Sequence, residues 1–447
     1  MAYTIKDLEK WNDAIEAIAK EIGLDYYEQE FEIISYKDML SYEAYLGMPS
    51  RYPHWSFGKA YEKNRTMYRY NLTGLPYEMV INSDPCLAYL MKDNTLLLQI
   101  LTMAHVYGHN DFFKNNRLFV EGSRADYTLE MFKLHADRVR AYIKDPSIGY
   151  ENVERILDAA HTIKLQTNRV VGEKRKSQEE LKKEILAYHK RKDDDFSFLR
   201  PYKEEEPPDI TKIPLEPEED ILYFIVNYGN LQEWEKSLIQ IVRKETAYFI
   251  PQIETKIMNE GWASFWHYNI LNKLDLGDKL HLEFIKRHND VIAPGNGWLN
   301  PYYIGFKIFE YLDTTYGREK IFEVRKIERD SSFLRRYLTE QLCEELNLFQ
   351  YGKSGNNYVI QEISDDTGWT TIRNTLCSNC GMGSVPVIRV VDVLKADNTL
   401  MLEHVFDGRE LNMDYAKSTL KYVAKLWGNT VKLKTKQFNG DMILVSQ

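Results

Sequence analysis

The chain has 447 residues, of which 44% are apolar and 13% aromatic; 58 Lys and Arg against 67 Asp and Glu give a net charge of −9. This composition excludes a disordered chain and is typical of a globular protein with roughly two or three domains and a well-buried core. The acidic balance disfavours binding to nucleic acid or to an anionic membrane surface, so neither partner is expected.

Cysteine usage and hydropathy indicate the compartment. The four cysteines, Cys86, Cys343, Cys377 and Cys380, are too few for a disulfide framework and favour a reducing environment. The first residues lack the apolar core of a signal peptide, and no run of about 18 apolar residues predicts a membrane span. Together these features predict a cytoplasmic protein.

Residues 1–165 predict a mixed α/β segment, the amino-terminal half of a larger body. An amphipathic helix is expected from Thr4, a suitable N-cap, to a stop at Gly23. "YYEQEFEIISY" and "YEMVINSD" (77–84) have the character of strands. A helix that opens at Asn94 is expected through "TLLLQILTMAHVYGH", followed by helices around "TLEMFKLHADRVRAYI" and "YENVERILDAAHTI".

Residues 166–220 predict an insert or linker that the fold does not need. The charged run "EKRKSQEELKKEILAYHKRKDDD" precedes a segment with five prolines: Pro201, Pro207, Pro208, Pro214 and Pro217. Such a segment offers little to bury, and we expect it to be solvated or partly disordered. Limited proteolysis is therefore expected to cleave the chain here first, whereas protection would show that the segment packs on the body.

Residues 221–352 predict the helical half of the body, and residues 353–447 a separate small α+β domain. "TKIMNEGWASFWHYNILNKL" continues a helical stripe, and "NPYYIGFKIFEYL" predicts a helix capped by Asn300 with Pro301 in its first turn. Beyond 353, short strands such as "VPVIRVVDV" and "TLMLEHVF" surround one helix, "NMDYAKSTLKYVAKLWG". We therefore predict an α+β fold: a mainly helical body and an independently folding C-terminal domain that contains the strands.

The segment "AHVYGHNDFF" places His105 and His109 one helical turn apart, a spacing at which two histidines can bind one metal ion. Both continue the apolar stripe of their helix, so they are expected to point inward. In the best-known metalloprotease motif a glutamate follows the first histidine, but here that residue is Val106. The pattern alone leaves two interpretations: a metal site, or two core histidines that bond to carbonyls or carboxylates.

Other helices also carry polar residues on faces expected to be buried. The members of this set are Glu260, Ser264 and His267; Glu154, Asp158 and His161; His135; and Glu245. Histidines and carboxylates from several helices are typical of a metal site in a bundle core, which we favour over a buried network of ion pairs and hydrogen bonds without metal. The lone "CSNC" of Cys377 and Cys380 has no second ligand pair and indicates a turn with two thiols.

Seven blocks, in order, resemble the stage V sporulation protein R (SpoVR) family: "RYPHWSFGKAYE", "YEMVINSDPCLAYL", "AHVYGHNDFFKNN", "VERILDAAH", "PQIETKIMNEGWASFWHY", "NPYYIGFKIFE" and "FLRRYLTEQLCEELNLF". The resemblance extends from about residue 27 to the C-terminus and weakens only in the insert. It implies a role in building the spore cortex, a modified peptidoglycan. Relatives in bacteria that do not sporulate are associated with a serine protein kinase and a von Willebrand-A-type protein.

A looser resemblance connects the histidine pair with gluzincin-type metallopeptidases, in which HxxxH and a glutamate from a later helix bind zinc. It implies His105, His109 and Glu260 of "NEGWA" as ligands, and "YEMVIN" as the edge strand that holds an extended peptide. Because Val106 replaces the catalytic glutamate, peptide hydrolysis needs another inward group as the base; alternatively, the metal is structural or binds without hydrolysis. The candidates for this base are His267, His161 and Glu154.

Two functions follow as hypotheses. The first is a metal-dependent hydrolase, with zinc as the expected cofactor, that acts on peptidoglycan peptides or precursors. The second is a non-catalytic regulator that docks a cell-wall enzyme or belongs to a stress kinase system. Val106 favours the second hypothesis, and the cluster of inward ionisable groups favours the first.

Overall fold

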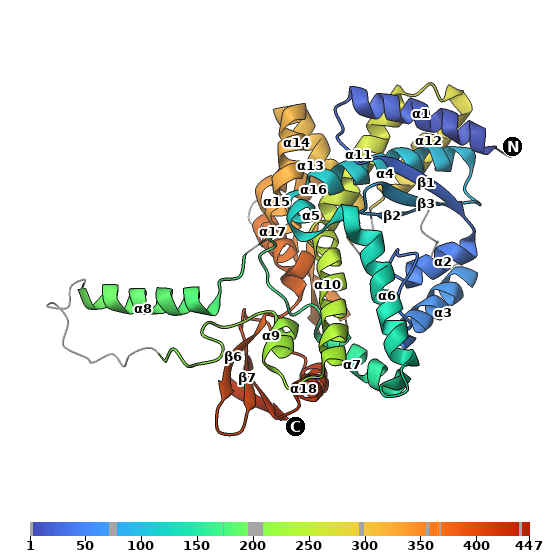
Figure 1. Cartoon of the computed structure of the whole chain (residues 1–447). Helices are drawn as coiled ribbons and strands as arrows, with labels where there is room; N and C mark the ends of the chain where they lie inside the picture. Colours follow the sequence, from blue (N-terminus) through green and yellow to red (C-terminus); the bar gives the residue numbers. More distant parts are fainter. Residues whose placement is uncertain are drawn as a thin grey trace. The chain divides into compact units, whose positions relative to one another are not determined.

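The computed structural model describes residues 3–70, 78–172, 174–194, 209–294, 299–354, 357–363, 365, 368–437 and 440–447. The chain forms two compact units, each built from two segments: unit 1 is Met1–Ala141 with Ala247–Ser384, and unit 2 is Tyr142–Thr246 with Val385–Gln447. Helices predominate and the sheets are small, which confirms the predicted α+β class (Figure 1). Each helix in the described ranges is too short or too polar to cross a bilayer.

Unit 1 holds most of the helices. Its elements are α1 Ile5–Glu21, β1 Gln29–Ile34, α2 Tyr36–Ala44, α3 Trp55–Arg69, β2 Glu78–Ile81, β3 Cys86–Met91, α4 Leu96–Asn115, α5 Arg117–Gly122, η1 Ala125–Tyr127, α6 Thr128–Lys144, α11 Lys256–Lys273, α12 Gly277–Val291, α13 Pro301–Tyr316, α14 Arg318–Ile327, α15 Asp330–Tyr337, α16 Glu340–Glu345, β4 Phe349–Ser354, β5 Asn357–Ile363, α17 Gly368–Asn379 and η3 Gly381–Ser384. The last residues of α6 extend past the unit boundary.

Helix ends largely follow the sequence signals. Thr4 caps α1 in a capping box with Asp7, and Asn300 caps α13, whose first residue is Pro301, as predicted. The helix expected to open at Asn94 begins two residues later, at Leu96. Thr95 is the cap, because its hydroxyl accepts a hydrogen bond from the backbone N–H of Leu98.

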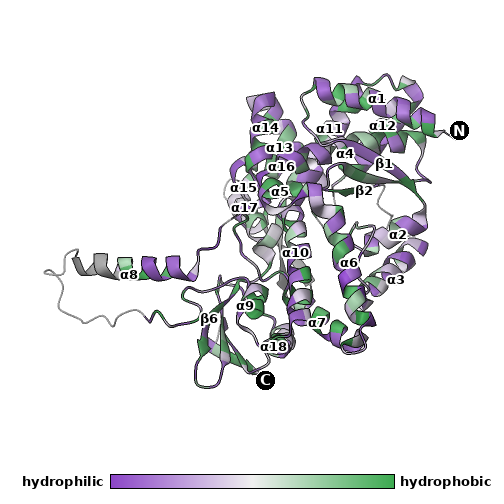
Figure 2. Cartoon of the chain, in the orientation of Figure 1, coloured by the Kyte–Doolittle hydropathy of each residue, from purple (hydrophilic) through white to green (hydrophobic). Residues whose placement is uncertain are grey.

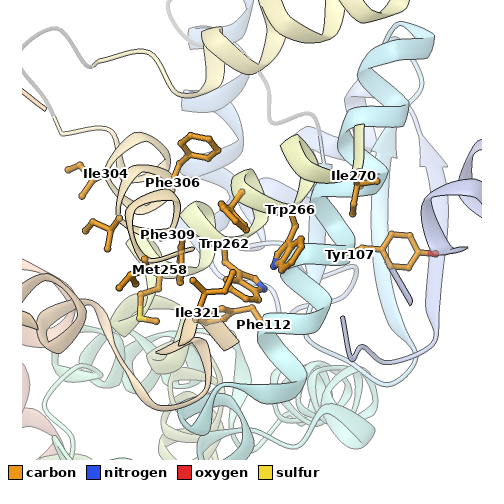
Figure 3. Close-up of a cluster of buried hydrophobic side chains, with 14 of the residues drawn as sticks. Tyr107, Phe112, Met258, Trp262, Trp266, Ile270, Ile304, Phe306, Phe309 and Ile321 are labelled. Carbon is orange, nitrogen blue, oxygen red and sulfur yellow. The ribbon is translucent and has the colours of Figure 1, made fainter. Parts of the chain in front are cut away.

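The core of unit 1 forms around three helices, α4, α11 and α13, with α4 and α13 packed on α11. Helix α4 is buried from Leu97 to Phe113 on every face, not along a single stripe. Aromatic rings from the neighbouring helices fill the space beside it, among them Trp262, Trp266 and Phe309 (Figure 3). A helix enclosed in this way holds its polar side chains away from bulk water.

Glycines let these three helices approach through their backbones. A Cβ added to Gly108 of α4 would lie 2.7 Å from the Cα of Ala263, and one added to Gly261 of α11 would lie 2.3 Å from the Cα of Gly305. Both separations are far shorter than an ordinary contact, so the sequence can hold the helices this close only without side chains at these positions.

Gly261→Ala is expected to destabilise unit 1, because its new methyl group meets backbone that cannot move aside as a side chain would. Overpacking of this kind costs about 1–3 kcal/mol, measurable as a lower midpoint in urea unfolding. Gly58→Ala is the matched control: Gly58 also lies in a helix, and a Cβ there meets nothing within 4 Å. That variant should be as stable as the wild type or more stable, and equal effects of the two changes would contradict the packing argument.

A three-stranded sheet lies in the same unit, in the order β1-β3-β2. β1 is parallel to β3 and β2 is antiparallel to it, with Glu78 opposite Leu90. Both strands predicted from "YYEQEFEIISY" and "YEMVINSD" are therefore present. β2 is an edge strand, and Glu78 and Val80 point to the same face because side chains alternate along a strand.

Unit 2 combines a second group of helices with a four-stranded sheet. Its elements are α7 Gly149–Ile163, α8 Gln178–Asp194, α9 Ile221–Tyr228, most of α10 Glu233–Glu254, β6 Ile388–Leu394, β7 Thr399–His404, α18 Met413–Trp427, β8 Val431–Gln437 and β9 Gly440–Ser446. The strand order is β6-β7-β8-β9. Helix α18 contacts β8, β9 and α7. Helix α7 packs on α18 but lies outside residues 353–447. Independent folding of residues 353–447 therefore stays a prediction.

The structure describes the predicted insert over residues 166–172, 174–194 and 209–220. The described side chains of α8 are half or fully exposed and largely hydrophilic (Figure 2). Near residue 220, the backbone of Glu218 forms an antiparallel bridge with Val390. Asp220 caps α9, and its carboxylate also accepts a hydrogen bond from Arg243. Pro201, Pro207 and Pro208 lie outside the described residues. The prediction that proteolysis cleaves the insert first stays a prediction.

Candidate metal centre

Four ionisable side chains converge inside unit 1 from three elements. His105 and His109 come from α4, Glu260 from α11 and Glu78 from β2. Glu260 Oε2 is 3.8 Å from His105 Nε2 and 3.5 Å from His109 Nε2, and Glu78 Oε1 is 4.0 Å from His105 Nε2. Only 4% and 6% of the two histidines is exposed, and about a fifth of each carboxylate side chain.

His109 is held by an amide. Its Nδ1 lies 2.9 Å from Asn259 Oδ1, one residue before Glu260 on α11. With the amide oxygen in that position the partner can only accept, so His109 Nδ1 carries the hydrogen. The lone pair is then left on Nε2, the atom that faces Glu260.

His105 is held by another histidine. Its Nδ1 is 2.9 Å from His267 Nδ1, and His267 Nε2 is in turn 2.8 Å from His288 Nδ1. The ring of His105 also stacks on that of Tyr302, with centroids 6.1 Å apart. Both ring nitrogens of His267, a base predicted from the sequence, are therefore engaged by other imidazoles.

Burial favours the neutral form of His109, His267 and His288. Desolvation and the charge of His105 lower the pKa of His109 to about 4, and desolvation lowers the pKa of His267 well below its usual value. The pKa of His288 also falls to about 4, chiefly through burial. A neutral imidazole has a free lone pair, which is the form that binds metal.

The two carboxylates are shifted in opposite directions. Burial would raise the pKa of Glu260, but the hydrogen bond and charge of His105 and the charge of His109 outweigh it and lower that pKa below its usual value. Burial raises the pKa of Glu78, and the charge of His105 only partly offsets this. The charge of Glu260 raises the pKa of Tyr302 well above its usual value, so this phenol stays protonated beside the cluster.

The spacing of these atoms fits a small divalent cation. Tetrahedral zinc with bonds of 2.0–2.1 Å separates its ligand atoms by about 3.3 Å. The distances from Glu260 Oε2 to the two Nε2 atoms exceed that value by a few tenths of an ångström, which small side-chain rotations can close. Glu78, His105 and His109 also offer ligand atoms that all lie within 4.8 Å of one another. The donor set, imidazole nitrogen with carboxylate oxygen, suits zinc.

The structure brings together the three candidate ligands that the sequence suggested and places a fourth ionisable residue, Glu78, beside them. Glu78 lies in "YEMVIN", which the sequence assigns to an edge strand but not to the site. One sequence signal could have identified Glu78: this acidic residue shares a strand face with Val80, which packs against the core. Val106 is fully buried. Its apolar side chain offers no polar group at the position where the metalloprotease motif has its glutamate.

Two other candidate residues lie in unit 2. Glu154 and His161 are half-buried on α7, whose buried face is formed by Val153, Ile156 and Leu157, among others. The Tyr150 hydroxyl donates a 2.6 Å hydrogen bond to Glu154. The expectation that this polar face of α7 points inward is therefore only partly met, and a catalytic role for either residue stays a prediction.

Cys377 and Cys380 are free thiols in unit 1, and burial raises the pKa of both. In the part of the chain that the structure describes, the group with metal-binding spacing contains neither of them. Their predicted role as two thiols in a turn needs one correction: Cys377 belongs to α17, and Cys380 follows the end of that helix.

Comparisons with known proteins agree with the seven sequence blocks. Residues 2–385 match the family described as SpoVR like protein, and residues 386–437 match the SpoVR-like C-terminal domain. An Escherichia coli (strain K12) relative, "Uncharacterized protein YcgB", is 33% identical over 495 residues, covering 100% of this chain and 95% of the relative. No solved structure matches the chain. The chain belongs to the SpoVR family.

Proposed function

We propose that this protein is a zinc-dependent hydrolase that cleaves an amide bond in a peptidoglycan peptide or precursor. The observation that carries the proposal is the convergence of two imidazole Nε2 atoms and two carboxylates, from α4, α11 and β2, in a largely buried site. Buried ionisable groups are costly unless they pair or bind a cation. Four of them at ligand spacing therefore support a metal centre.

His105, His109 and Glu260 are the proposed ligands. Glu260 Oε2 lies 3.8 Å and 3.5 Å from the two Nε2 atoms, whereas Glu78 Oε1 lies 4.0 Å from His105 Nε2 and within 4.8 Å of a ligand atom of His109, so Glu78 is the more distant carboxylate. Three protein ligands leave a position open for substrate or water, which is the arrangement of catalytic zinc sites. A zinc ion held here would supply a Lewis acid and make water nucleophilic near neutral pH.

Glu78 is the proposed general base. It adjoins the ligands from the strand side and could take the place of the carboxylate that Val106 does not provide. The raised pKa of Glu78 and the lowered pKa of Glu260 agree with this division of roles, since a base needs proton affinity and a ligand needs charge. His267 suits the role less well, because both of its nitrogens bond to histidines.

The substrate class is supported by the position of β2. Within the described residues this strand pairs with β3 on one side only, so its other edge offers backbone groups to an extended chain. Glu78 is the first residue of β2, so a peptide lying along the strand would pass the centre. The SpoVR resemblance directs the choice of peptide toward peptidoglycan.

One observation favours the alternative of a non-catalytic regulator, namely the buried valine at position 106. In that case the centre would serve as a docking site for a cell-wall enzyme or for the serine protein kinase system. The two hypotheses differ in turnover, which the Glu78 variant tests.

Glu78→Gln is expected to lower hydrolysis of muropeptides by at least about 100-fold while zinc content stays near that of the wild type, because the amide cannot accept the proton. Product release is followed by mass spectrometry and zinc by elemental analysis. Glu32→Gln, an exposed change on β1 of the same sheet, is the control and should keep full activity. If the Glu78 variant loses zinc as well, Glu78 is a ligand; if wild-type protein with bound zinc turns over no muropeptide, the regulator hypothesis is the better one.

A further inference from the structure

The proposed ligand His105 stands at one end of a chain of three imidazoles. Its Nδ1 lies 2.9 Å from His267 Nδ1, and His267 Nε2 lies 2.8 Å from His288 Nδ1. The three residues come from α4, α11 and α12, and they are 4%, 0% and 3% exposed. Both hydrogen bonds therefore join one imidazole to another, away from bulk water.

Such a chain has only two arrangements of hydrogens. A neutral imidazole carries one N–H and one lone pair, and each bond needs one of each. In the first arrangement the hydrogens are on Nδ1 of His105, Nε2 of His267 and Nε2 of His288. In the second they are on Nε2 of His105, Nδ1 of His267 and Nδ1 of His288. The first turns a lone pair toward Glu260, and the second turns an N–H toward it.

We infer that His267 and His288 are positioning residues that hold His105 in the tautomer whose Nε2 binds the metal, and that metal binding sets the donor-to-acceptor direction of both hydrogen bonds between the three histidines. This inference rests on the proposed function. A metal on His105 Nε2 leaves the hydrogen on Nδ1, which forces His267 to accept there and to donate through Nε2 to His288.

The metal-free protein can use the second arrangement, in which His105 Nε2–H faces Glu260 Oε2 at 3.8 Å and Glu78 Oε1 at 4.0 Å. Metal binding then changes the tautomer of all three imidazole rings. One proton leaves Nε2 of His105, one passes from His267 to His105, one passes from His288 to His267, and one is taken up at Nε2 of His288. The number of bound protons is unchanged, but a proton is released at the metal and gained two rings away.

The two ligand histidines therefore differ. His109 bonds to the amide of Asn259, and with its carbonyl oxygen facing the ring this partner can only accept. His105 depends on partners that can either donate or accept, so its tautomer is decided by the full chain. Rings surround the far end of that chain: Tyr268 and Phe306 lie 4.6 Å and 5.1 Å from His288 between centroids.

The first test is the zinc affinity of variants with matched shape. His288→Phe keeps an aromatic ring among aromatic neighbours but removes the acceptor for His267, and we expect zinc to bind about tenfold more weakly. His267→Phe should lower the zinc affinity about 10- to 100-fold. His267→Asn should retain much of the wild-type affinity, because its side-chain carbonyl can accept a hydrogen bond from His105 Nδ1. His281→Phe, an exposed change on the same helix α12, should bind zinc as the wild type does.

The second test is nitrogen NMR of the zinc-loaded wild type labelled with ¹⁵N-histidine. The expected pattern is a protonated Nδ1 on His105 and a protonated Nε2 on His267 and His288. Protonation of His267 at Nδ1, or unchanged zinc affinity in both Phe variants, would overturn the inference and leave the metal site standing. A wild-type protein that binds no zinc would remove the proposed function and the inference together.

Discussion

His105→Ala and His109→Ala are each expected to abolish stoichiometric zinc binding while the helical circular dichroism stays near that of the wild type. Each change removes one of three proposed ligands. Loss of a ligand should lower the zinc affinity by more than the roughly 100-fold that follows loss of a residue that only hydrogen-bonds to a ligand. The wild type should retain about one zinc per chain after purification without chelator, and each variant less than about a tenth of that.

The control for this experiment is His281→Ala, which removes an exposed histidine from α12 in the same unit. It should leave zinc content unchanged, so that a general loss of histidine cannot explain the result. The fold should persist in the ligand variants because α4 is held by apolar neighbours along its whole length. Wild-type protein that stays free of metal in zinc-supplemented medium would contradict the proposal, and the histidines would then form a purely structural network.

Arg325→Ala is expected to destabilise unit 1 by about 3–5 kcal/mol, the largest effect on stability among the changes considered. Arg325 Nη1 donates to Asp111 Oδ2 at 2.9 Å, and the pair is buried, with 6% and 0% exposed. Trp262 Nε1–H donates to the same oxygen at 2.8 Å, and the backbone N–H of Asp25 donates to Oδ1 at 2.8 Å. Without the guanidinium, a buried carboxylate loses its only counter-charge among these partners.

Urea unfolding at pH 8 measures this cost, because Asp111 is then ionised. Burial raises the pKa of Asp111 to about 6, although Arg325 opposes the shift. Since this pKa lies above the unfolded value near 4, and the substitution raises it further, the variant should regain stability as the pH falls through that pKa. The control is Arg124→Ala, which breaks an exposed pair with Asp126 and should leave the free energy of unfolding close to that of the wild type, because solvent screens the pair. Similar losses from the two arginines would contradict the role of burial.

The sequence predicted the local features that short-range chemistry decides. The caps Thr4 and Asn300 need only a side-chain oxygen that reaches N–H groups two or three residues away. The histidine pair is equally local, since one helical turn sets both side chains on the same side. His105, His109 and Glu260 could therefore be named as a group, although the partner in α11 was reached through a resemblance and not through spacing.

The parts that long-range packing decides were harder to predict. A stripe of apolar residues does not show that α4 is buried on all faces, because periodicity reports one buried face only. Glu78 was missed since a strand residue enters the site through sheet register, and Glu78 opposite Leu90 cannot be derived from composition. His288 was missed for the same reason: α12 reaches His267 only after the helices have packed.

The backbone contact between α4 and α11 has a consequence for which ions the centre can accept. Gly108 meets Ala263 where a methyl group could not fit, so the helix that carries both histidines cannot move closer to the helix that carries Glu260, and the tightly packed core resists their separation. The donors that these two helices bring to the centre are therefore fixed in kind and in position. They are two imidazole nitrogens and a carboxylate, whereas calcium takes six or more oxygen ligands, so this donor set favours first-row transition ions over the more abundant calcium.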